Sequence, residues 1–185
     1  MMLVNWIFAN TYQLDPTVDS EHLKSIGPSW GGWRTWRSCN TDNVICYDLD
    51  KSIDLIGRAF QAVCNFYVPK KYYQELGRPM GVRLYDGEFS FDVDHVEDII
   101  SMHLASESAD IVLMAGFDLG PIPDSEDRVA LTKIKHYHGM IRSKINSTPD
   151  VQWVLVDHPQ NLDKIYKDLP NLTCDTMENA LKLLL

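Results

Sequence analysis

Short runs of consecutive apolar residues restrict most strongly how this chain can fold. They are rich in β-branched and aromatic residues, which favours β-strands. The runs cover residues 3–9, 44–47, 82–85, 111–115 and 151–156. Apolar residues on consecutive rather than alternating positions indicate strands that are covered on both faces, as in a parallel sheet between two layers of helices.

Helical patterns lie between these runs. Apolar residues recur at three- and four-residue steps in three segments, which predicts helices with one face on the sheet. They are Ile53, Ile56, Ala59, Phe60 and Val63, then Val93, Val96, Ile99, Ile100 and Leu104, then Leu131, Ile134, His138, Ile141 and Ile145. A last helix is expected after Asp175, where Glu178 follows at cap-like spacing.

Strands alternating with helices predict one α/β domain over residues 1–185. It should be a three-layer, Rossmann-like domain with a mostly parallel sheet of about five to six strands flanked by helices. The chain is long enough to bury one substantial core and has no linker-like stretch.

Composition narrows the possible partners. The formal net charge is −9, from 26 acidic and 17 basic residues, which argues against nucleic acid as a partner. No apolar run approaches the roughly 20 residues that a membrane-spanning helix needs, and the first residues show no signal-peptide pattern. We therefore expect a soluble protein without membrane contact.

The four cysteines have the spacing of neither a zinc site nor a disulfide scaffold, so free thiols are expected. Cys46 and Cys64 lie in apolar stretches and should be buried. His136 and His138 resemble a metal pair, but residues two apart on a helix diverge, and His138 lies on the apolar stripe. We predict a hydrogen-bonded core histidine, and neither a metal nor a cofactor.

Three of the five tryptophans fall in one short window, Trp30-Gly31-Gly32-Trp33-Arg34-Thr35-Trp36-Arg37. The two glycines favour a loop, expected at the ligand-binding edge of the sheet beside Gly27-Pro28-Ser29. Tryptophan and arginine dominate binding hot spots, so Trp30, Trp33, Arg34, Trp36 and Arg37 are the candidate contact patch. The alternative is that the rings fill the core.

Two further candidates follow strands. In an open parallel sheet, ligands bind beyond the carboxyl ends of the strands. Asp118 follows the run 111–115, and His158 follows the run 151–156 just after Asp157. Asp118 and His158 are thus weak candidates for a general base. Alternatively, the carboxylates of Asp118 and Asp157 cap backbone donors in tight turns.

Several short motifs occur in the same order as in a known enzyme family. They are Gly27-Pro28-Ser29, Cys64-Asn65, Gly116-Phe117-Asp118-Leu119 and His136-Tyr137-His138-Gly139. In this the chain resembles bacterial sialyltransferases that use CMP-sialic acid, which implies a Rossmann-like fold. It also implies a phosphate or nucleotide loop formed by Gly27, Ser29, Gly31, Asn65, Gly116 and Asp118. Met140 replaces the family's presumed general base, which argues against catalysis by that mechanism.

A second resemblance covers most of the chain. Residues 27–37, 63–67 and 152–158 look like uncharacterised proteins of T4-like tailed phages of marine bacteria. Together these observations favour a non-catalytic phage protein, a virion component or binding module with virion or host proteins as partners. The resemblance implies that it is found in the host cytoplasm or in the virion. The alternative is a glycosyltransferase-like enzyme that acts on a nucleotide-sugar or another phosphorylated small molecule.

Overall fold

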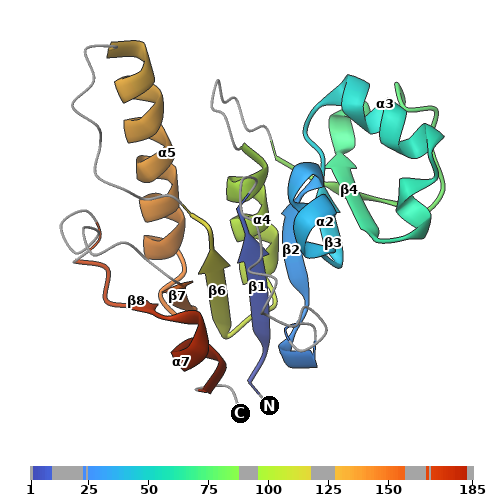
Figure 1. Ribbon diagram of the computed structural model, residues 1–185. Coiled ribbons are helices and arrows are strands. Elements are labelled where there is room, and N and C mark those ends of the chain that lie inside the picture. Colours follow the sequence, from blue (N-terminus) through green and yellow to red (C-terminus); the bar gives the residue numbers. More distant parts are fainter. Residues whose placement is uncertain are drawn as a thin grey trace.

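The computed structural model describes residues 2–9, 23, 25–87, 96–117, 128–156, 166 and 168–182. Within these residues an eight-stranded sheet forms the centre of the molecule (Figure 1). The strands are β1 (Val4–Phe8), β2 (Ser29–Gly32), β3 (Asn43–Ile45), β4 (Asn65–Pro69), β5 (Val82–Tyr85), β6 (Ile111–Ala115), β7 (Gln152–Val156) and β8 (Leu172–Asp175). The helices are α2 (Trp33–Cys39), α3 (Leu49–Gly57), α4 (Val96–Ser106), α5 (Arg128–Asn146) and α7 (Met177–Lys182), with the short 3₁₀ turns η1 (Phe60–Ala62) and η2 (Lys70–Tyr72).

Every strand pairing is parallel, and the strand order is β5-β4-β3-β2-β1-β6-β7-β8. The chain builds outward from β1 to β5 and then crosses back to place β6 on the other side of β1. At this central strand, Ile7 pairs with Trp30 of β2 and with Met114 of β6. This is the doubly wound order of Rossmann-like folds, which confirms the predicted fold class with a larger sheet.

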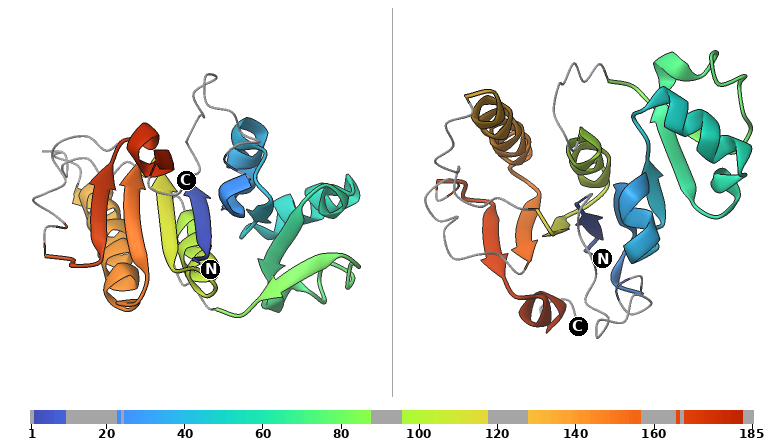
Figure 2. Two further views of the ribbon diagram at one scale, coloured as in Figure 1. Left: turned by 90° about the horizontal axis from the view of Figure 1, so that it is seen from below. Right: turned by 45° about the horizontal axis from the view of Figure 1, so that its top comes forward.

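The two faces of the sheet carry separate cores, as consecutive apolar residues require. On one face, Ile7, Met114 and Leu155 are buried with residues of α4 and α5. On the other face, Trp6 and Leu113 are buried against α7, and a neighbouring cluster joins β3 and β4 to α3. Figure 2 shows the helices on both sides of the strands, so the domain has three layers.

The sequence pattern missed three strands, β2, β4 and β8. β2 has the sequence Ser-Trp-Gly-Gly, β4 ends in Pro69, and β8 is the edge strand Leu-Thr-Cys-Asp. Glycine and proline are both unfavourable in strands, and an edge strand needs little apolar character. The sheet is consequently larger than predicted.

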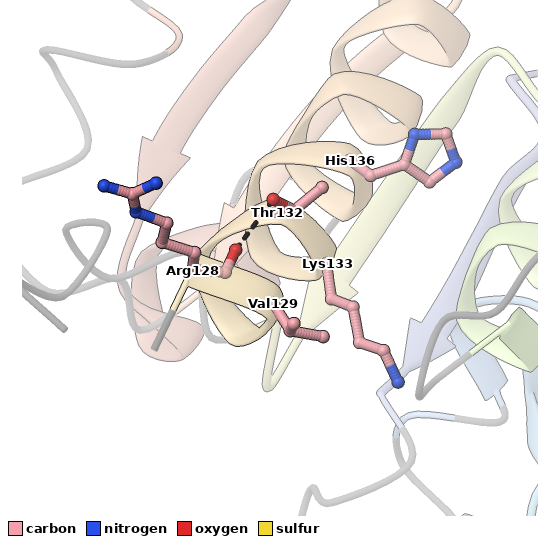
Figure 3. A pocket seen from close by; sticks show the side chains of 5 residues that line it. All are labelled: Arg128, Val129, Thr132, Lys133 and His136. Carbon is pink, nitrogen blue, oxygen red and sulfur yellow. Dashed lines mark hydrogen bonds between the residues drawn. The ribbon is translucent and has the colours of Figure 1, made fainter. Parts of the chain in front are cut away.

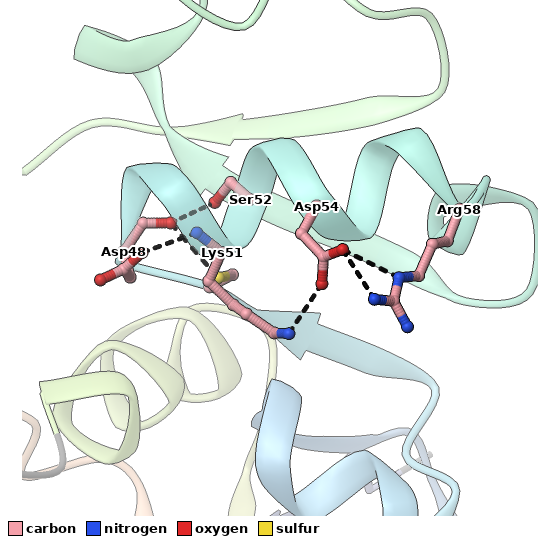
Figure 4. A network of polar contacts seen from close by, with 6 residues as sticks. Asp48, Lys51, Ser52, Asp54 and Arg58 are labelled. Carbon is pink, nitrogen blue, oxygen red and sulfur yellow. Dashed lines mark hydrogen bonds and ion pairs between the residues drawn. The ribbon is translucent and has the colours of Figure 1, made fainter.

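Helix α3 begins earlier and ends earlier than its apolar stripe suggested. It starts at Leu49 because the Asp48 side chain accepts a hydrogen bond from the Lys51 amide at 2.7 Å (Figure 4). It ends at Gly57, before Ala59, whose backbone is left-handed. Ile53 and Val63 are therefore 50 % and 65 % exposed, and their assignment to the buried stripe was wrong.

The other helical predictions stand in their described parts. In α5, His138, Ile141 and Ile145 are buried. α7 is capped by Thr176, whose hydroxyl accepts from the Asn179 amide at 3.2 Å, rather than by Asp175. All four cysteines are free thiols; Cys46 is buried as predicted, whereas Cys64 is only partly buried. None of the described helices is long and apolar enough to cross a membrane.

Candidate functional site

The carboxyl ends of the parallel strands meet along one edge of the sheet, and this edge is where doubly wound domains bind ligands. The arrowheads of β1 and β6 in Figure 1 point to it. At these two strands the chain changes direction in the sheet order. Ala9 directly follows β1, and its carbonyl accepts a hydrogen bond from Thr35 of α2 at 3.0 Å. Gly116 follows β6 with a positive φ of 72°.

The tryptophan window is a strand that runs directly into a helix, so the expectation of a loop was wrong. Residues 29–32 form β2, and α2 begins at Trp33. A Cβ atom on Gly31 would lie 3.1 Å from the carbonyl oxygen of Phe8 and 3.2 Å from Cβ of Thr35. The glycine thus lets β1, β2 and α2 pack closely, which is a structural use of the residue.

Two of the three rings in the window pack against other aromatic rings of the fold. Trp30 is 8 % exposed, and its ring lies 5.3 Å from that of Tyr67. Trp36 packs edge-on against Phe60 with ring centres 4.7 Å apart. The indole nitrogens of both tryptophans are buried. Trp30 is therefore a core residue, whereas Trp36 is partly buried and packs against the core cluster of β3 and β4.

Trp33 is the tryptophan of the window that lies next to positively charged side chains. It is partly buried at the start of α2, and three cationic groups approach its ring. Lys51 Nζ lies 4.5 Å from the ring centre, and the guanidinium carbons of Arg34 and Arg37 lie at 5.3 and 5.7 Å. Lys51 is also paired with Asp54 at 2.8 Å (Figure 4). Arg34 and Arg37 are exposed, and they leave a basic surface on α2.

The predicted phosphate loop is divided between the two edges of the sheet. Ser29 and Asn65 open β2 and β4, so they lie at the amino edge, opposite the ligand edge. Ser29 donates its amide and hydroxyl to Asp42 Oδ2 at 2.9 and 2.7 Å. The Asn65 side chain donates to Asn43 Oδ1 at 3.1 Å, and Asn43 donates to the Ser29 carbonyl at 3.1 Å. These polar groups are used within the fold.

The remaining residues of the predicted phosphate loop do not gather at the carboxyl edge either. Gly27 also precedes β2, and Gly31 lies inside β2. Of the loop residues that the structure describes, only Gly116 lies at the carboxyl edge. The candidates Asp118, Asp157 and His158 fall outside the described residues. Any part they play at the carboxyl edge stays a prediction.

The two neighbouring histidines of α5 have different surroundings. His138 is 6 % exposed, and its Nδ1 lies 2.6 Å from the hydroxyl oxygen of Tyr166, so it is a hydrogen-bonded core histidine as predicted. His136 is exposed. Among the described residues, no group of three or more histidine, cysteine, aspartate or glutamate side chains could hold a metal ion.

A surface hollow of about 470 Å³ lies beside the first half of α5. All its described lining residues come from this one helix: Arg128, Val129, Thr132, Lys133 and His136. In Figure 3 the Arg128 and Lys133 side chains point to different sides of the helix, and the Thr132 hydroxyl is bonded to the Arg128 carbonyl. Because these groups diverge, they do not converge on a common ligand atom.

A second pocket, of about 300 Å³, lies at the carboxyl ends of β4 and β5. It is lined by Pro69, Lys70, Lys71, Tyr85, Asp86 and Gly87. Lys70 Nζ pairs with Asp86 at 3.1 Å across the strand ends. Lys71 Nζ instead donates to the hydroxyl oxygen of Tyr47 at 3.3 Å. The pocket is thus lined by charged and phenolic residues from the end of β4, the start of η2 and the end of β5.

The electrostatics of this pocket keep its donors protonated. Burial, and to a lesser extent the negative charge of Glu97, raises the pKa of Tyr85 well above its ordinary value. The hydrogen bond to Tyr47 raises the pKa of Lys71. At neutral pH the Tyr85 phenol is therefore neutral, and the Lys71 ammonium carries its full charge.

Sequence reasoning missed this pocket because it missed β4. With residues 65–69 taken as a connection, Lys70 and Lys71 are ordinary surface lysines. The signal for this strand in the sequence was the apolar triplet Phe66-Tyr67-Val68, which is followed by a proline and two lysines. A short apolar run between polar turn residues is typical of a buried strand.

Fold and site together define a doubly wound α/β protein with a polar pocket at the carboxyl edge of its sheet. No protein family, no curated protein and no solved structure matches the chain.

Proposed function

We propose that this protein is a binding domain that takes a small phosphorylated molecule at the carboxyl edge of its sheet. The contrast between the two edges carries the proposal. At the amino edge, Ser29, Asn43 and Asn65 are bonded within the fold. At the carboxyl edge, the pocket at β4 and β5 holds Lys70, which is paired with Asp86, and Lys71, which is paired with none of the described carboxylates and so brings a positive charge to the pocket. Ligand sites of doubly wound sheets form at this edge.

A ligand panel tests this proposal on the full chain. Nucleotides, nucleotide-sugars and sugar phosphates would be screened by thermal shift, and hits would be confirmed by calorimetry. A ligand that binds only the folded state raises the melting temperature, by about 2 °C or more when it is present well above its Kd. If no member of the panel binds, the proposal is wrong.

A second candidate function is protein binding through α2, favoured by the three cations around Trp33. Arg34 and Arg37 would contact an acidic partner surface, with Trp33 as the apolar anchor. Trp30 is buried and Trp36 packs in part against Phe60, so this candidate function centres on Trp33 and its arginines. In the phage context of the resemblance, the partner would be a virion or host protein.

Purified phage particles provide the test of this second function. Mass spectrometry should detect the wild-type protein in them, and Arg34→Gln with Arg37→Gln should abolish its incorporation. Arg78→Gln, at another exposed arginine, is the matched control. Incorporation that is unchanged by the double substitution would rule out this surface.

A further inference from the structure

Positive charge is concentrated around Trp33, although the chain as a whole carries a formal net charge of −9. Three cationic groups lie within 5.7 Å of the centre of the Trp33 ring. Arg34 and Arg37 belong to α2, and Lys51 belongs to α3. Like charges in so small an area repel one another, so an anion that binds among them is attracted by all three.

Asp54 supplies such an anion on the α3 side of this cluster. Its carboxylate pairs with Lys51 at 2.8 Å and with Arg58 at 2.9 Å (Figure 4). Each of the two cations is bound by a different carboxylate oxygen. One carboxylate therefore bridges two neighbouring cations here, which a group with two acceptor oxygens is able to do.

The two arginines of α2 have no equivalent carboxylate. Arg34 and Arg37 are exposed and three residues apart, so they lie on the same side of the helix. Neither forms an ion pair with a carboxylate of the described residues. Asp48 and Asp50 lie at the start of α3, where Asp48 caps the helix. The guanidinium donors of α2 are therefore available to a carboxylate from outside, which they match in geometry.

We propose that Arg34 and Arg37 bind the carboxylates of an acidic segment of a partner protein, one rich in aspartate and glutamate. This inference rests on the second candidate function, protein binding through α2, and specifies the chemistry of the partner. The Trp33 ring holds both guanidinium groups near it, so less conformational entropy is lost when they bind. A nucleic acid fits less well, because its row of phosphates would extend past this small cluster along an acidic protein.

Fluorescence anisotropy with the full chain and a labelled hexaglutamate peptide tests the inference. Hexaglutamate should bind, and its affinity should fall as NaCl is added, because salt screens exposed charges. Hexaglutamine, which has the same length and no charge, should not bind. Failure of hexaglutamate to bind at about 1 mM protein would overturn the inference. Tighter binding of a hexathymidine oligonucleotide than of hexaglutamate would identify a nucleic-acid surface and overturn it as well.

Substitutions with opposite expected effects locate the peptide. Arg34→Gln with Arg37→Gln should weaken hexaglutamate binding at least about threefold. Asp54→Asn should strengthen it about two- to threefold, because it removes the internal carboxylate that neutralises Lys51. A role of these residues in folding alone would not produce a gain in affinity. Arg78→Gln, at another exposed arginine, is the matched control and should leave binding unchanged. Unchanged affinity in either of the first two variants would contradict the inference.

The outcomes separate this inference from the second candidate function. If the double arginine substitution abolishes incorporation into phage particles but hexaglutamate does not bind, α2 contacts a partner of other chemistry, and this inference alone fails. If hexaglutamate binds through Arg34 and Arg37 while incorporation is unchanged, the site for an acidic segment stands and its partner is not a virion protein.

Discussion

Gly27 packs directly against the backbone of Val4: a Cβ atom on Gly27 would lie 1.9 Å from the Val4 carbonyl oxygen. The contact joins the turn before β2 to the start of β1, and Trp6 next to it donates its amide to the Pro28 carbonyl at 2.9 Å. A glycine expected in a phosphate loop is thus required for close approach of two backbones. The same contact fixes how β1 and β2 are aligned at the amino edge.

Replacement of Gly27 by alanine should destabilise the fold strongly. The added methyl group must move one of the two backbones, and we expect a loss of about 3 kcal/mol or more in the free energy of unfolding. Gly139→Ala is the matched control, because nothing lies within 4 Å of its Cβ position in α5. It should stabilise the protein by about 0.5–1 kcal/mol, since alanine is the better helix former. Urea unfolding of both variants checks this, and equal effects would contradict it.

Trp36→Ala should cost far more stability than Trp33→Ala. Trp36 packs against Phe60 with its indole nitrogen buried, so truncation leaves a cavity and should cost about 3–4 kcal/mol. Trp33 is partly buried against the same cluster, but one side of its ring faces cationic side chains rather than an aromatic ring, so its truncation should cost about half as much. Chemical denaturation of the two variants measures the difference. A larger loss at Trp33 would show that its ring, and not that of Trp36, holds α2 in place.

Tyr85→Phe should leave the free protein as stable as the wild type or more stable, by up to about 1 kcal/mol. The substitution removes a buried oxygen that lacks a partner and keeps the ring in its cluster with Val96 and Ile100. Thermal and urea unfolding without ligand check this. A clear loss of stability would show that the hydroxyl is bonded in the free protein.

Stability should fall as the pH is lowered below about 6.5 because of His103. Burial, and secondarily the charge of Lys144, lowers the pKa of His103 from 6.5 to about 4. The folded state therefore favours the neutral ring, whereas the unfolded chain takes up a proton as the pH falls from about 6.5 towards 4. Between pH 7 and 5 we expect a loss on the order of 1 kcal/mol, after allowance for partial solvent exposure.

Urea unfolding at several pH values measures this effect. His103→Gln should flatten the profile in this range, while His136→Gln, at an exposed position of α5, should not. A profile that is unchanged by His103→Gln would assign the acid sensitivity to other groups.

Much of the site was beyond reach of the sequence, and the tryptophan window shows why. Trp33 and Trp36 are three residues apart, which is helical spacing, but two glycines before them obscured the pattern. Whether those glycines form a loop or a strand depends on the neighbours: Gly31 is a strand residue because Phe8 and Thr35 approach it closely. The conformational preference of glycine alone cannot show whether these two residues form a loop or a strand.

Consecutive apolar residues on the central strands determined the class of the fold by themselves. Runs such as 111–115 cannot be stable with one face in water, so a parallel sheet between two layers of helices followed from burial alone. Only the tertiary structure decided the strand order, and with it which residues share an edge. It placed Ser29 and Asn65 at the amino edge and gathered Lys71 and Tyr85 at the carboxyl edge. Residues 14 apart in the chain meet there because β4 and β5 are paired in parallel, a long-range relationship that no local pattern encodes.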